Sequence, residues 1–313
     1  MVAVLVRPRR LLAALSVGAL TLTVGAPLAA SARPRVPAPV CVVWAGHVRC
    51  TPWHPADTWA SSASVLVATW RPWSSQSSIV ATAAWFNARS TLLGLYPGYK
   101  VPGPSVLDRG PEMVPPQARR SLLATFNGGF YEVDAAGGFF AHQTLYAPMR
   151  RGLATVVRYR TGRVDVITWT GGPRPPATVV LARQNLPLLV AAGRPTPASA
   201  DNAAWGVTLY GAPAVWRSAL GVDASGNLVY AAAPGLTSAM LATLMVQLHC
   251  VRAMELDINP EWPVLITYGG PGAARPLMQT PNPNQISTRY LAVSTKDFFA
   301  LYATRTPGAP QPW

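Results

Sequence analysis

Between Leu122 and Leu256 the chain alternates short apolar segments with turn-forming residues, and this pattern restricts the fold more than any other feature. Segments of this length, bounded by Gly, Pro, Asn and Asp, are typical of strands joined by tight turns. The sequence Asp223–Asn227, DASGN, predicts the turn of one hairpin, so Asp223 is interpreted as a turn acceptor. We expect strands at Leu122–Phe126, Gly152–Tyr159, Arg163–Trp169, Leu186–Ala191, Val207–Leu209, Ser218–Val222 and Leu228–Ala233.

Few helices interrupt this series. Thr237 is placed to cap a helix whose apolar residues fall on one face, namely Met240, Leu241, Leu244, Met245 and Leu248. A strand at Ala253–Leu256 follows it, and a second helix is expected near Ser77–Leu93. Strands in succession with a few helices predict an α+β fold, with mixed β-sheets and a few packed helices.

The first 32 residues have the pattern of a secretory signal peptide. Three arginines precede the apolar run Leu11–Ala30, and Ala30-Ser31-Ala32 supplies a cleavage site. The alternative is a membrane anchor, since about 20 apolar residues span a bilayer. We favour cleavage, and because no second run of that length exists, we expect no membrane span in the mature chain. The expected location is secreted or cell-wall associated.

The rest of the chain shows three changes of composition. Residues 33–40 form a proline-rich linker, and residues 41–116 form a Trp-rich N-terminal lobe that ends in a Pro/Gly-rich passage. Residues 117–300 form the main domain, and residues 301–313 form a C-terminal tail. The lobe's tryptophans are expected to serve packing, with carbohydrate stacking as the alternative.

Charge and cysteines agree with export. Removing residues 1–32 takes away three arginines and leaves 23 basic against 12 acidic residues, a net charge of +11. Such a charge suits a carbohydrate or sugar-phosphate polymer as partner. Nucleic acid is not expected, because no Lys-rich run or basic helix is present. The alternating segment between Cys41 and Cys50 predicts a hairpin closed by a disulfide, and Cys250 is interpreted as a buried thiol.

Two segments place polar side chains at the ends of strands or inside them. Asn127, Gly128 and Gly129 follow the first strand of the main domain, and glycines there let the backbone approach a ligand closely. The Gly-rich stretch after them carries His142, which is a weaker candidate. Arg217 lies in an apolar strand, so it requires an anionic partner, either a structural carboxylate such as Asp257 or a bound phosphate.

The acidic cluster MELDINPEW, residues 254–262, is the strongest candidate for chemistry. Three of the chain's 12 acidic residues lie in it. Alternation predicts that Glu255 and Asp257 share a strand face, where two carboxylates separate in pKa and suit acid–base work. A strand-end turn or a calcium site is the alternative. No cofactor is required, and a divalent cation would be held by Asp257 and Asn259.

The order of these motifs resembles the phosphodiester glycosidase family, which includes the enzyme that uncovers mannose 6-phosphate. Five motifs in the family's order carry the resemblance, over roughly residues 122–293: the Asn-Gly-Gly-aromatic elbow, QNLPLLVAAG at 184–193, WRSALGVDASGNLVY at 216–230, GLT at 235–237, and a strand that ends in Leu-Asp. The segment after Asp257, INPEW at 258–262, replaces the family's Gly- and Ser-containing loop and is similar to secreted actinobacterial relatives.

The resemblance implies a hydrolase that cleaves a sugar 1-phosphodiester in a wall polymer or exopolysaccharide. It places the family's asparagine, arginine and aspartate on Asn127, Arg217 and Asp257. Catalysis is then expected from Asp257, Glu255 and Arg217, and substrate binding from Asn127, Gly128, Gly129, His142 and Asn259. The alternative is a non-catalytic, secreted glycan- or cell-wall-binding protein on the same scaffold, favoured by the altered loop after Asp257.

Overall fold

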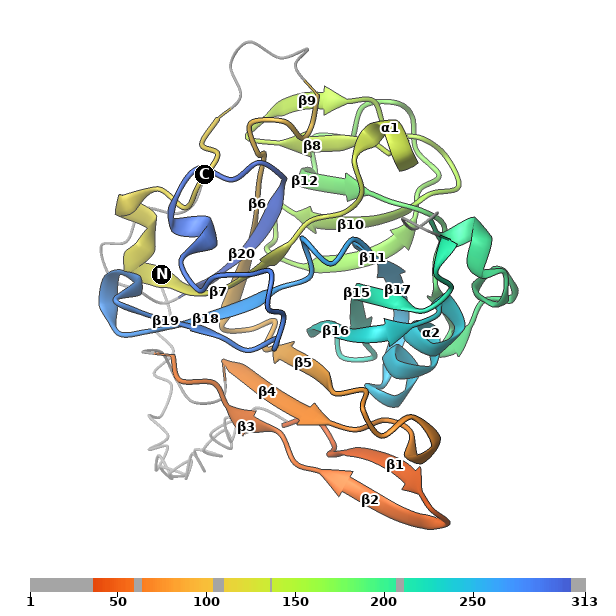
Figure 1. The fold of residues 1–313 in the computed structure, drawn as a ribbon. Helices are drawn as coiled ribbons and strands as arrows, with labels where there is room; N and C mark the ends of the chain where they lie inside the picture. Colours follow the sequence, from red (N-terminus) through yellow and green to blue (C-terminus); the bar gives the residue numbers. More distant parts are fainter. Residues whose placement is uncertain (1–35, 59–63, 104–109, 136, 207–210, 305–313) are drawn as a thin grey trace, which may run out of the picture. The chain divides into compact units, whose positions relative to one another are not determined.

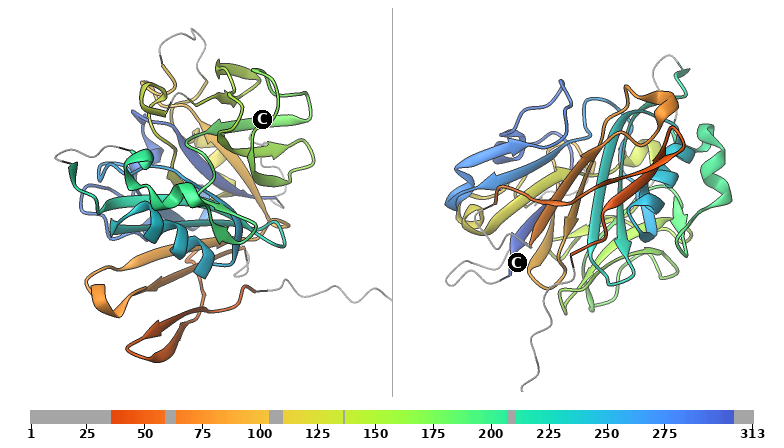
Figure 2. Two further views of the ribbon diagram at one scale, coloured as in Figure 1. Left: turned by 90° about the vertical axis from the view of Figure 1, so that its right-hand side faces the viewer. Right: turned by 90° about the horizontal axis from the view of Figure 1, so that it is seen from below.

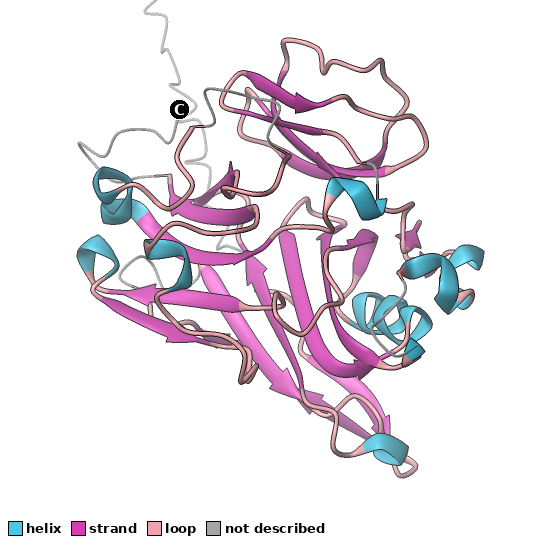
Figure 3. Cartoon of the chain, turned by 45° about the horizontal axis from the view of Figure 1, so that its top comes forward, coloured by secondary structure: helices cyan, strands magenta, loops and turns pink. Residues whose placement is uncertain are grey.

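The computed structural model describes residues 36–58, 64–103, 110–135, 137–206 and 211–304. These residues form twenty β-strands but only two α-helices, so the expected class with few helices is confirmed (Figure 1, Figure 3). Each strand pair among them is antiparallel, so the mixed sheets expected from the sequence are not found in the described residues. The expected signal peptide, the strand at 207–209 and most of the C-terminal tail lie outside the described residues. Within the described part, no helix is both long and apolar enough to cross a membrane.

The largest sheet has eight strands and contains the longest hairpin of the described residues. Strands β15 and β16 pair from Val222 with Leu228 to Val215 with Leu236, across the turn predicted at 223–227. Asp223 accepts backbone hydrogen bonds there from Ser225 and Asn227, which confirms its turn role. In order across the sheet, the strands are β14 (Arg194–Pro195), β13 (Val190–Ala191), β17 (Cys250–Glu255), β15 (Val215–Asp223), β16 (Leu228–Leu236), β5 (Ala81–Phe86), β4 (Val65–Trp70) and β3 (His54–Pro55).

Two five-stranded sheets complete the main part of the fold. One contains, in order, β11 (Val164–Thr168), β10 (Ala154–Tyr159), β12 (Val179–Gln184), β8 (Phe139–Ala141) and β9 (Thr144–Ala147). The other contains β19 (Arg275–Met278), β18 (Leu265–Gly269), β7 (Leu122–Asn127), β20 (Phe298–Ala303) and β6 (Thr91–Tyr96). We call them the β12 sheet and the β7 sheet. The hairpin β10–β11 was predicted from its Thr161-Gly162 turn.

One hydrophobic core is shared by the three sheets. Phe86 and Tyr230 come from the eight-stranded sheet, Phe126 and Phe299 from the β7 sheet, and Phe139 from the β12 sheet. The rings of Phe126 and Tyr230 lie 5.0 Å apart, and those of Phe126 and Phe299 lie 5.3 Å apart. Burial of these rings holds the sheets together, because each removes a large apolar area from water.

The outer face of the eight-stranded sheet is covered by α2 (Ser238–Gln247). Leu241, Leu244 and Met245 of α2 are fully buried in this second core, as the helical spacing predicts. The absence of a side chain at Gly221 permits this packing, because a Cβ there would lie 2.8 Å from the Cys250 sulfur. Cys250 is buried and unpaired, which agrees with its interpretation as a core thiol.

The segment before residue 116 differs in part from expectation. The hairpin of β1 (Val40–Trp44) and β2 (His47–Thr51) and the Cys41–Cys50 disulfide are confirmed. The helix expected near residues 77–93 is wrong, because β5 and β6 occupy this range, joined by a turn at 87–90. All six β5 residues are buried, so the chain shows no alternation that would indicate a strand.

Strands from both sides of residue 116 share sheets. β5 pairs with β16, and β6 pairs with β20, so the described residues before and after that position form common layers. Both views in Figure 2 show the orange strands beside the teal strands of the hairpin β15–β16. The described residues from Val36 onward accordingly belong to one compact unit.

The N-cap of α2 gives a direct test of this part of the fold. The Thr237 side chain accepts a hydrogen bond of 3.2 Å from the backbone nitrogen of Met240. We expect Thr237→Ala to lower the free energy of unfolding by about 1 kcal/mol, as loss of a cap does. Thr243→Ala is the matched control, since Thr243 lies in the same helix and is bonded only to Ala239 O. Thermal unfolding measures both, and equal shifts would contradict the capping role.

Candidate functional site

Two buried ion pairs lie where the three sheets approach one another, and a third, between Arg217 and Glu255, lies on the face of the eight-stranded sheet that α2 covers. Each joins a basic side chain to one of the chain's few acidic residues, and five of the six side chains are 3% exposed or less. Two of the pairs connect different sheets through the segment that leads into β20. The pairs are Arg183 of β12 with Asp297, Lys296 with Asp257, and Arg217 of β15 with Glu255 of β17.

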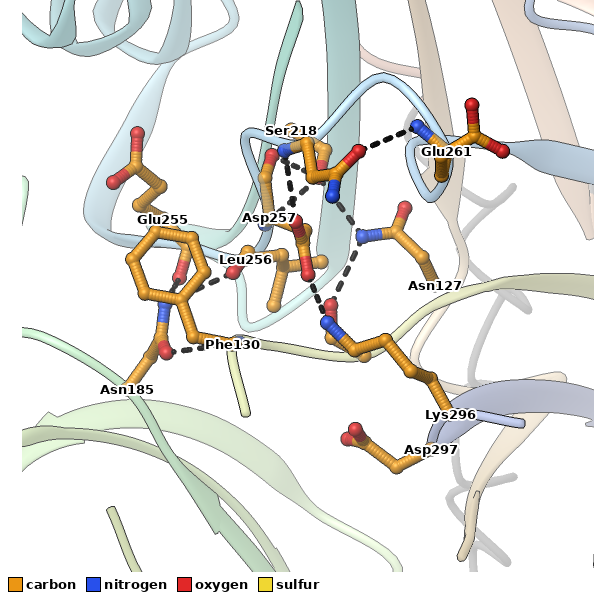
Figure 4. Close-up of polar contacts among 12 residues, drawn as sticks. Asn127, Phe130, Asn185, Ser218, Glu255, Leu256, Asp257, Glu261, Lys296 and Asp297 are labelled. Carbon is orange, nitrogen blue, oxygen red and sulfur yellow. Dashed lines mark hydrogen bonds and ion pairs between the residues drawn. The ribbon is translucent and has the colours of Figure 1, made fainter. Parts of the chain in front are cut away.

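The pair of Lys296 and Asp257 is the centre of the candidate site (Figure 4). Asp257 follows β17, and its side chain is 3% exposed against 5% for that of Lys296. Asp257 Oδ2 accepts a hydrogen bond from Lys296 Nζ, and Asp257 Oδ1 accepts one of 2.9 Å from Asn259 N. Burial raises the pKa of Asp257, and the Lys296 ammonium and these hydrogen bonds offset part of that effect.

Two aromatic rings flank the Lys296 ammonium. Its nitrogen lies 4.5 Å from the ring centroid of Tyr131 and 5.0 Å from that of Trp262. Tyr131 follows the glycine elbow, and Trp262 belongs to the segment 258–262 after Asp257; both side chains are half-buried. The Arg289 guanidinium lies 4.7 Å from the same Trp262 ring. Cations over aromatic faces are stabilised there, so the rings hold the ammonium beside Asp257.

Asn127 organises the backbone on which Asp257 sits. Its side-chain nitrogen donates to Ser218 Oγ and to Gly128 O, each at 2.9 Å, and its oxygen accepts from Tyr230 and from the backbone of Val264. Ser218 Oγ in turn donates to Asp257 O and accepts from Asp257 N, both at 3.2 Å. Asn127 therefore acts on Asp257 through Ser218, as a positioning residue.

The two glycines of the elbow are required for close approach. A Cβ at Gly128 would lie 2.0 Å from Asp297 Oδ2, and a Cβ at Gly129 would lie 3.1 Å from Asn185 Oδ1. Gly128 N also donates to Asp297 O at 3.0 Å. The elbow thus packs directly against the segment that carries Lys296, and the glycine pattern in the sequence has a structural reason.

Arg217 and Glu255 form a separate pair. Arg217 Nη1 donates to Glu255 Oε1 at 2.6 Å, and its remaining donors reach Leu236 O, Trp205 O and Asn202 Oδ1. The expectation that Glu255 and Asp257 share a strand face is wrong. Their side chains point in different directions (Figure 4), because β17 ends at Glu255 and strand alternation does not continue to residue 257. Glu255 Oε2 is buried without a hydrogen-bond partner. Burial raises the pKa of Glu255 to about 7, although the Arg217 charge opposes the shift.

Two other residues predicted to bind substrate are His142 and Asn259. His142 does not contact the Asp257 carboxylate, and Asn259 contacts it only through its backbone nitrogen. The His142 ring bonds Leu95 O at 3.0 Å and packs edge-on to Tyr96, and burial lowers its pKa to about 4. Asn259 contacts Asp257 through its backbone nitrogen, while its side-chain oxygen accepts from Glu261 N. Within the described ranges, no group of three or more His, Cys, Asp or Glu is placed to hold a metal ion.

Sequence reasoning missed Lys296, Asp297 and Arg183. Lys296 is one of only two lysines in the chain, and this rarity is the signal that would have drawn attention to it. Asp297 bonds Arg183 Nε at 2.9 Å. The strand pattern around Arg183 resembles that of Arg217, an arginine inside an apolar strand, so the argument applied to Arg217 holds for it as well.

Comparison with known proteins supports the resemblance drawn from the motifs. Residues 120–257 match the family model described as phosphodiester glycosidase. The fold is similar to that of the catalytic domain of zebrafish N-acetylglucosamine-1-phosphodiester alpha-N-acetylglucosaminidase, auto-inhibited by its pro-peptide, with a TM-score of 0.50 and 13% identity over 82% of this chain and 88% of that chain. A hypothetical protein from Synechocystis has a TM-score of 0.42 at 12% identity, over 82% of this chain and 62% of that one. No curated protein matches the chain.

The raised pKa of Glu255 makes stability depend on pH. The folded protein keeps a proton on Glu255 up to about pH 7, whereas the unfolded chain releases it near the ordinary value of 4.5. The folded state therefore binds more protons between these values, and the free energy of unfolding falls as pH rises through this window, by up to about 3 kcal/mol. We expect Glu255→Gln, which mimics the protonated acid, to flatten this dependence in denaturant titrations.

Glu261→Gln serves as the control, because Glu261 is an exposed carboxylate of the same acidic cluster. It should leave the pH dependence unchanged. If the slope of Glu255→Gln equals that of the unmodified protein, Glu255 is ionised in the folded state and the interpretation is wrong.

Proposed function

We propose that this chain, whose residues 120–257 match the phosphodiester glycosidase family model, is an exported hydrolase. Its substrate would be a sugar 1-phosphodiester in a wall polymer or exopolysaccharide, and the bond cleaved would be that between the anomeric carbon and the phosphate oxygen. One observation carries the proposal: the aspartate that ends the matched segment is paired with a lysine held between two aromatic rings. A carboxylate can accept a proton from the attacking water, and a cation can stabilise the departing phosphate.

The phosphate would take over the positive charge of Lys296. A phosphate oxygen near the ammonium competes with Asp257 for it, and this frees the carboxylate for chemistry. The leaving group is a phosphate monoester, which departs more easily than an alkoxide, so strong general acid catalysis is less necessary than in ordinary glycoside hydrolysis. Lys296 would stabilise the negative charge that develops on this oxygen as the bond breaks.

Asp257 would then act on the incoming water. Water oxygen bonds to the anomeric carbon, its proton passes to Asp257, and the electron pair of the broken bond stays on the phosphate oxygen. The raised pKa of Asp257 makes it a better proton acceptor than an exposed aspartate. Tyr131 and Trp262, both half-buried, would contact the sugar ring by its apolar face. The cation is Lys296, so no step of this proposal passes through a metal ion.

The alternative remains a glycan- or wall-binding protein on the same scaffold. It would be favoured by tryptophans exposed along a groove. Of those in residues 41–116, the five that the structure describes are buried or half-buried: Trp44, Trp53, Trp70, Trp73 and Trp85. The sixth, Trp59, lies outside the described residues. The packing role expected for this group therefore accounts for the described members.

Replacement of both members of the central pair separates catalysis from folding. We expect Asp257→Asn to lower kcat/KM for a sugar 1-phosphodiester by at least about 100-fold, the usual contribution of a general base. It also leaves Lys296 buried without its partner, which costs about 3–5 kcal/mol of stability. The double variant Asp257→Asn/Lys296→Met removes both charges and should recover most of that stability while it stays inactive. Turnover and thermal unfolding are measured on the same samples, with and without EDTA.

If the double variant regains turnover together with stability, the pair serves only the fold. The same conclusion follows if Asp257→Asn lowers the melting temperature and leaves turnover unchanged. Either result would reject the catalytic proposal and favour the glycan-binding alternative.

Export is a second part of the proposal, based on the arginines and the Ala30-Ser31-Ala32 site at the start of the chain. Mass spectrometry of protein recovered from the culture medium or cell wall should find a mature terminus near Arg33. Recovery of intact protein that begins at Met1, in the cytosol alone, would contradict it.

A further inference from the structure

Two neighbouring loops of the β12 sheet place exposed arginines on one ledge. Residues 149–152 run alongside residues 169–173, because Met149 N bonds Pro173 O at 2.8 Å and Gly152 N bonds Trp169 O at 2.9 Å. We call this pair of loops, with Arg150, Arg151 and Arg174, the arginine ledge. All three arginines are exposed, as are the intervening residues 170–173. The ledge is therefore a solvent-facing surface with a defined backbone.

A buried glutamine fixes the ledge to the end of β12. Gln184 is 0% exposed, and its side-chain amide bonds both backbone groups of Arg150, each at 2.8 Å. The same amide also bonds Gly138 N and Thr155 Oγ1, so all of its bonds hold backbone or strand groups in place. An amide satisfied in this way rigidifies the segment that it holds. The backbone of the ledge at Arg150 is therefore held in one conformation by Gln184.

The same strand end reaches the candidate site. Arg183, the residue before Gln184, pairs with Asp297, which is adjacent to Lys296. Asn185, the residue after it, bonds Leu256 O at 3.0 Å, next to Asp257, and accepts from Phe130 N, next to Tyr131. Three consecutive residues of one chain segment therefore connect the ledge with both sides of the central ion pair. β12 ends on the side of its sheet where α1 (Glu132–Ala135) lies (Figure 1).

The charge of the ledge is not neutralised by its own loops. Residues 148–153 and 169–178 contain three arginines and no aspartate or glutamate. Asp165, the acidic residue of the β12 sheet's neighbouring strand β11, already pairs with Arg163 and Arg252. Guanidinium groups bind phosphate oxygens in bidentate fashion, so three exposed arginines on neighbouring loops suit an anion that carries several phosphates.

We propose that the arginine ledge binds the phosphates of a sugar-phosphate polymer beyond the bond that is cleaved. The choice of polymer rests on the proposed function, whereas the anion-binding surface does not. Contacts to remote phosphates would hold the polymer so that one sugar 1-phosphate unit lies at Lys296 and Asp257. The ledge would then raise the affinity for long substrates and leave the cleavage of short ones unchanged.

The test compares two double variants of equal charge. Arg151→Gln/Arg174→Gln alters the ledge, and Arg89→Gln/Arg194→Gln removes two exposed arginines outside it, one in the turn between β5 and β6 and one in β14. Binding of fluorescently labelled long-chain inorganic polyphosphate is measured over a range of salt concentrations. We expect the ledge variant to bind roughly tenfold more weakly at low salt, with a salt slope smaller by about 1.5, as for the loss of two phosphate contacts. The control variant should change little.

Turnover of a short sugar 1-phosphodiester, measured on the same samples, keeps this proposal separate from the proposed function. Both double variants should cleave the short substrate at the rate of the unmodified protein. If the protein shows no turnover at all, the polyphosphate binding measurement still tests the arginine ledge. Equal loss of polyphosphate binding in both variants would show attraction by net charge alone and overturn the proposal. It would also be overturned if the ledge variant loses binding only to vesicles of phosphatidylglycerol and not to polyphosphate.

Discussion

The ion pair of Lys296 and Asp257 is buried at the point where the three sheets meet, and much of the surrounding structure serves to make that burial tolerable. Removal of two charges from water costs several kcal/mol for each ion, which the attraction between them repays only when other polar partners are present. Asn259 N bonds the carboxylate, two aromatic rings flank the ammonium, and Ser218 holds the backbone. These groups come from strand β15, the loop at Tyr131 and the loop that holds Asn259 and Trp262, so the pair and the arrangement of these segments stabilise each other.

The fold was predictable where the determining contacts are short-range. The hairpins at 154–168 and 215–236 follow from their turns, and α2 follows from a cap and a helical apolar spacing. The strand β5 was not predicted, because all six of its residues are buried and it shows no alternation of polar and apolar side chains. Its neighbour β16 lies more than 140 residues later, at Leu228 opposite Phe86, and nothing in the local sequence names that partner.

The same limit applies to the candidate site. Motif order identified Asn127 and Asp257. The two glycines after Asn127 were expected to allow close approach, and a Cβ at Gly128 or Gly129 would indeed come too close to Asp297 or Asn185. Lys296 lies 39 residues after Asp257, in a segment without a recognised motif, so its pairing appears only in three dimensions. For Arg217 the sequence required an anionic partner but left its identity open. The structure gives Glu255, 38 residues later on the neighbouring strand β17.

The scarcity of acidic residues links the interior of this protein to its surface. Asp257 and Asp297 are each paired with a buried cation, and Asp165 is shared between two arginines. Within such pairs the charges cancel, so much of the excess of 26 basic over 12 acidic residues is carried by solvent-facing arginines with few carboxylates to oppose them. A surface of that kind attracts polyanions over long range, whereas a buried pair acts only on groups that reach it. The scarcity of acidic residues therefore supports both parts of the proposed mechanism. Surface arginines attract an anionic polymer, and in the interior a phosphate replaces the Asp257 carboxylate as the partner of Lys296.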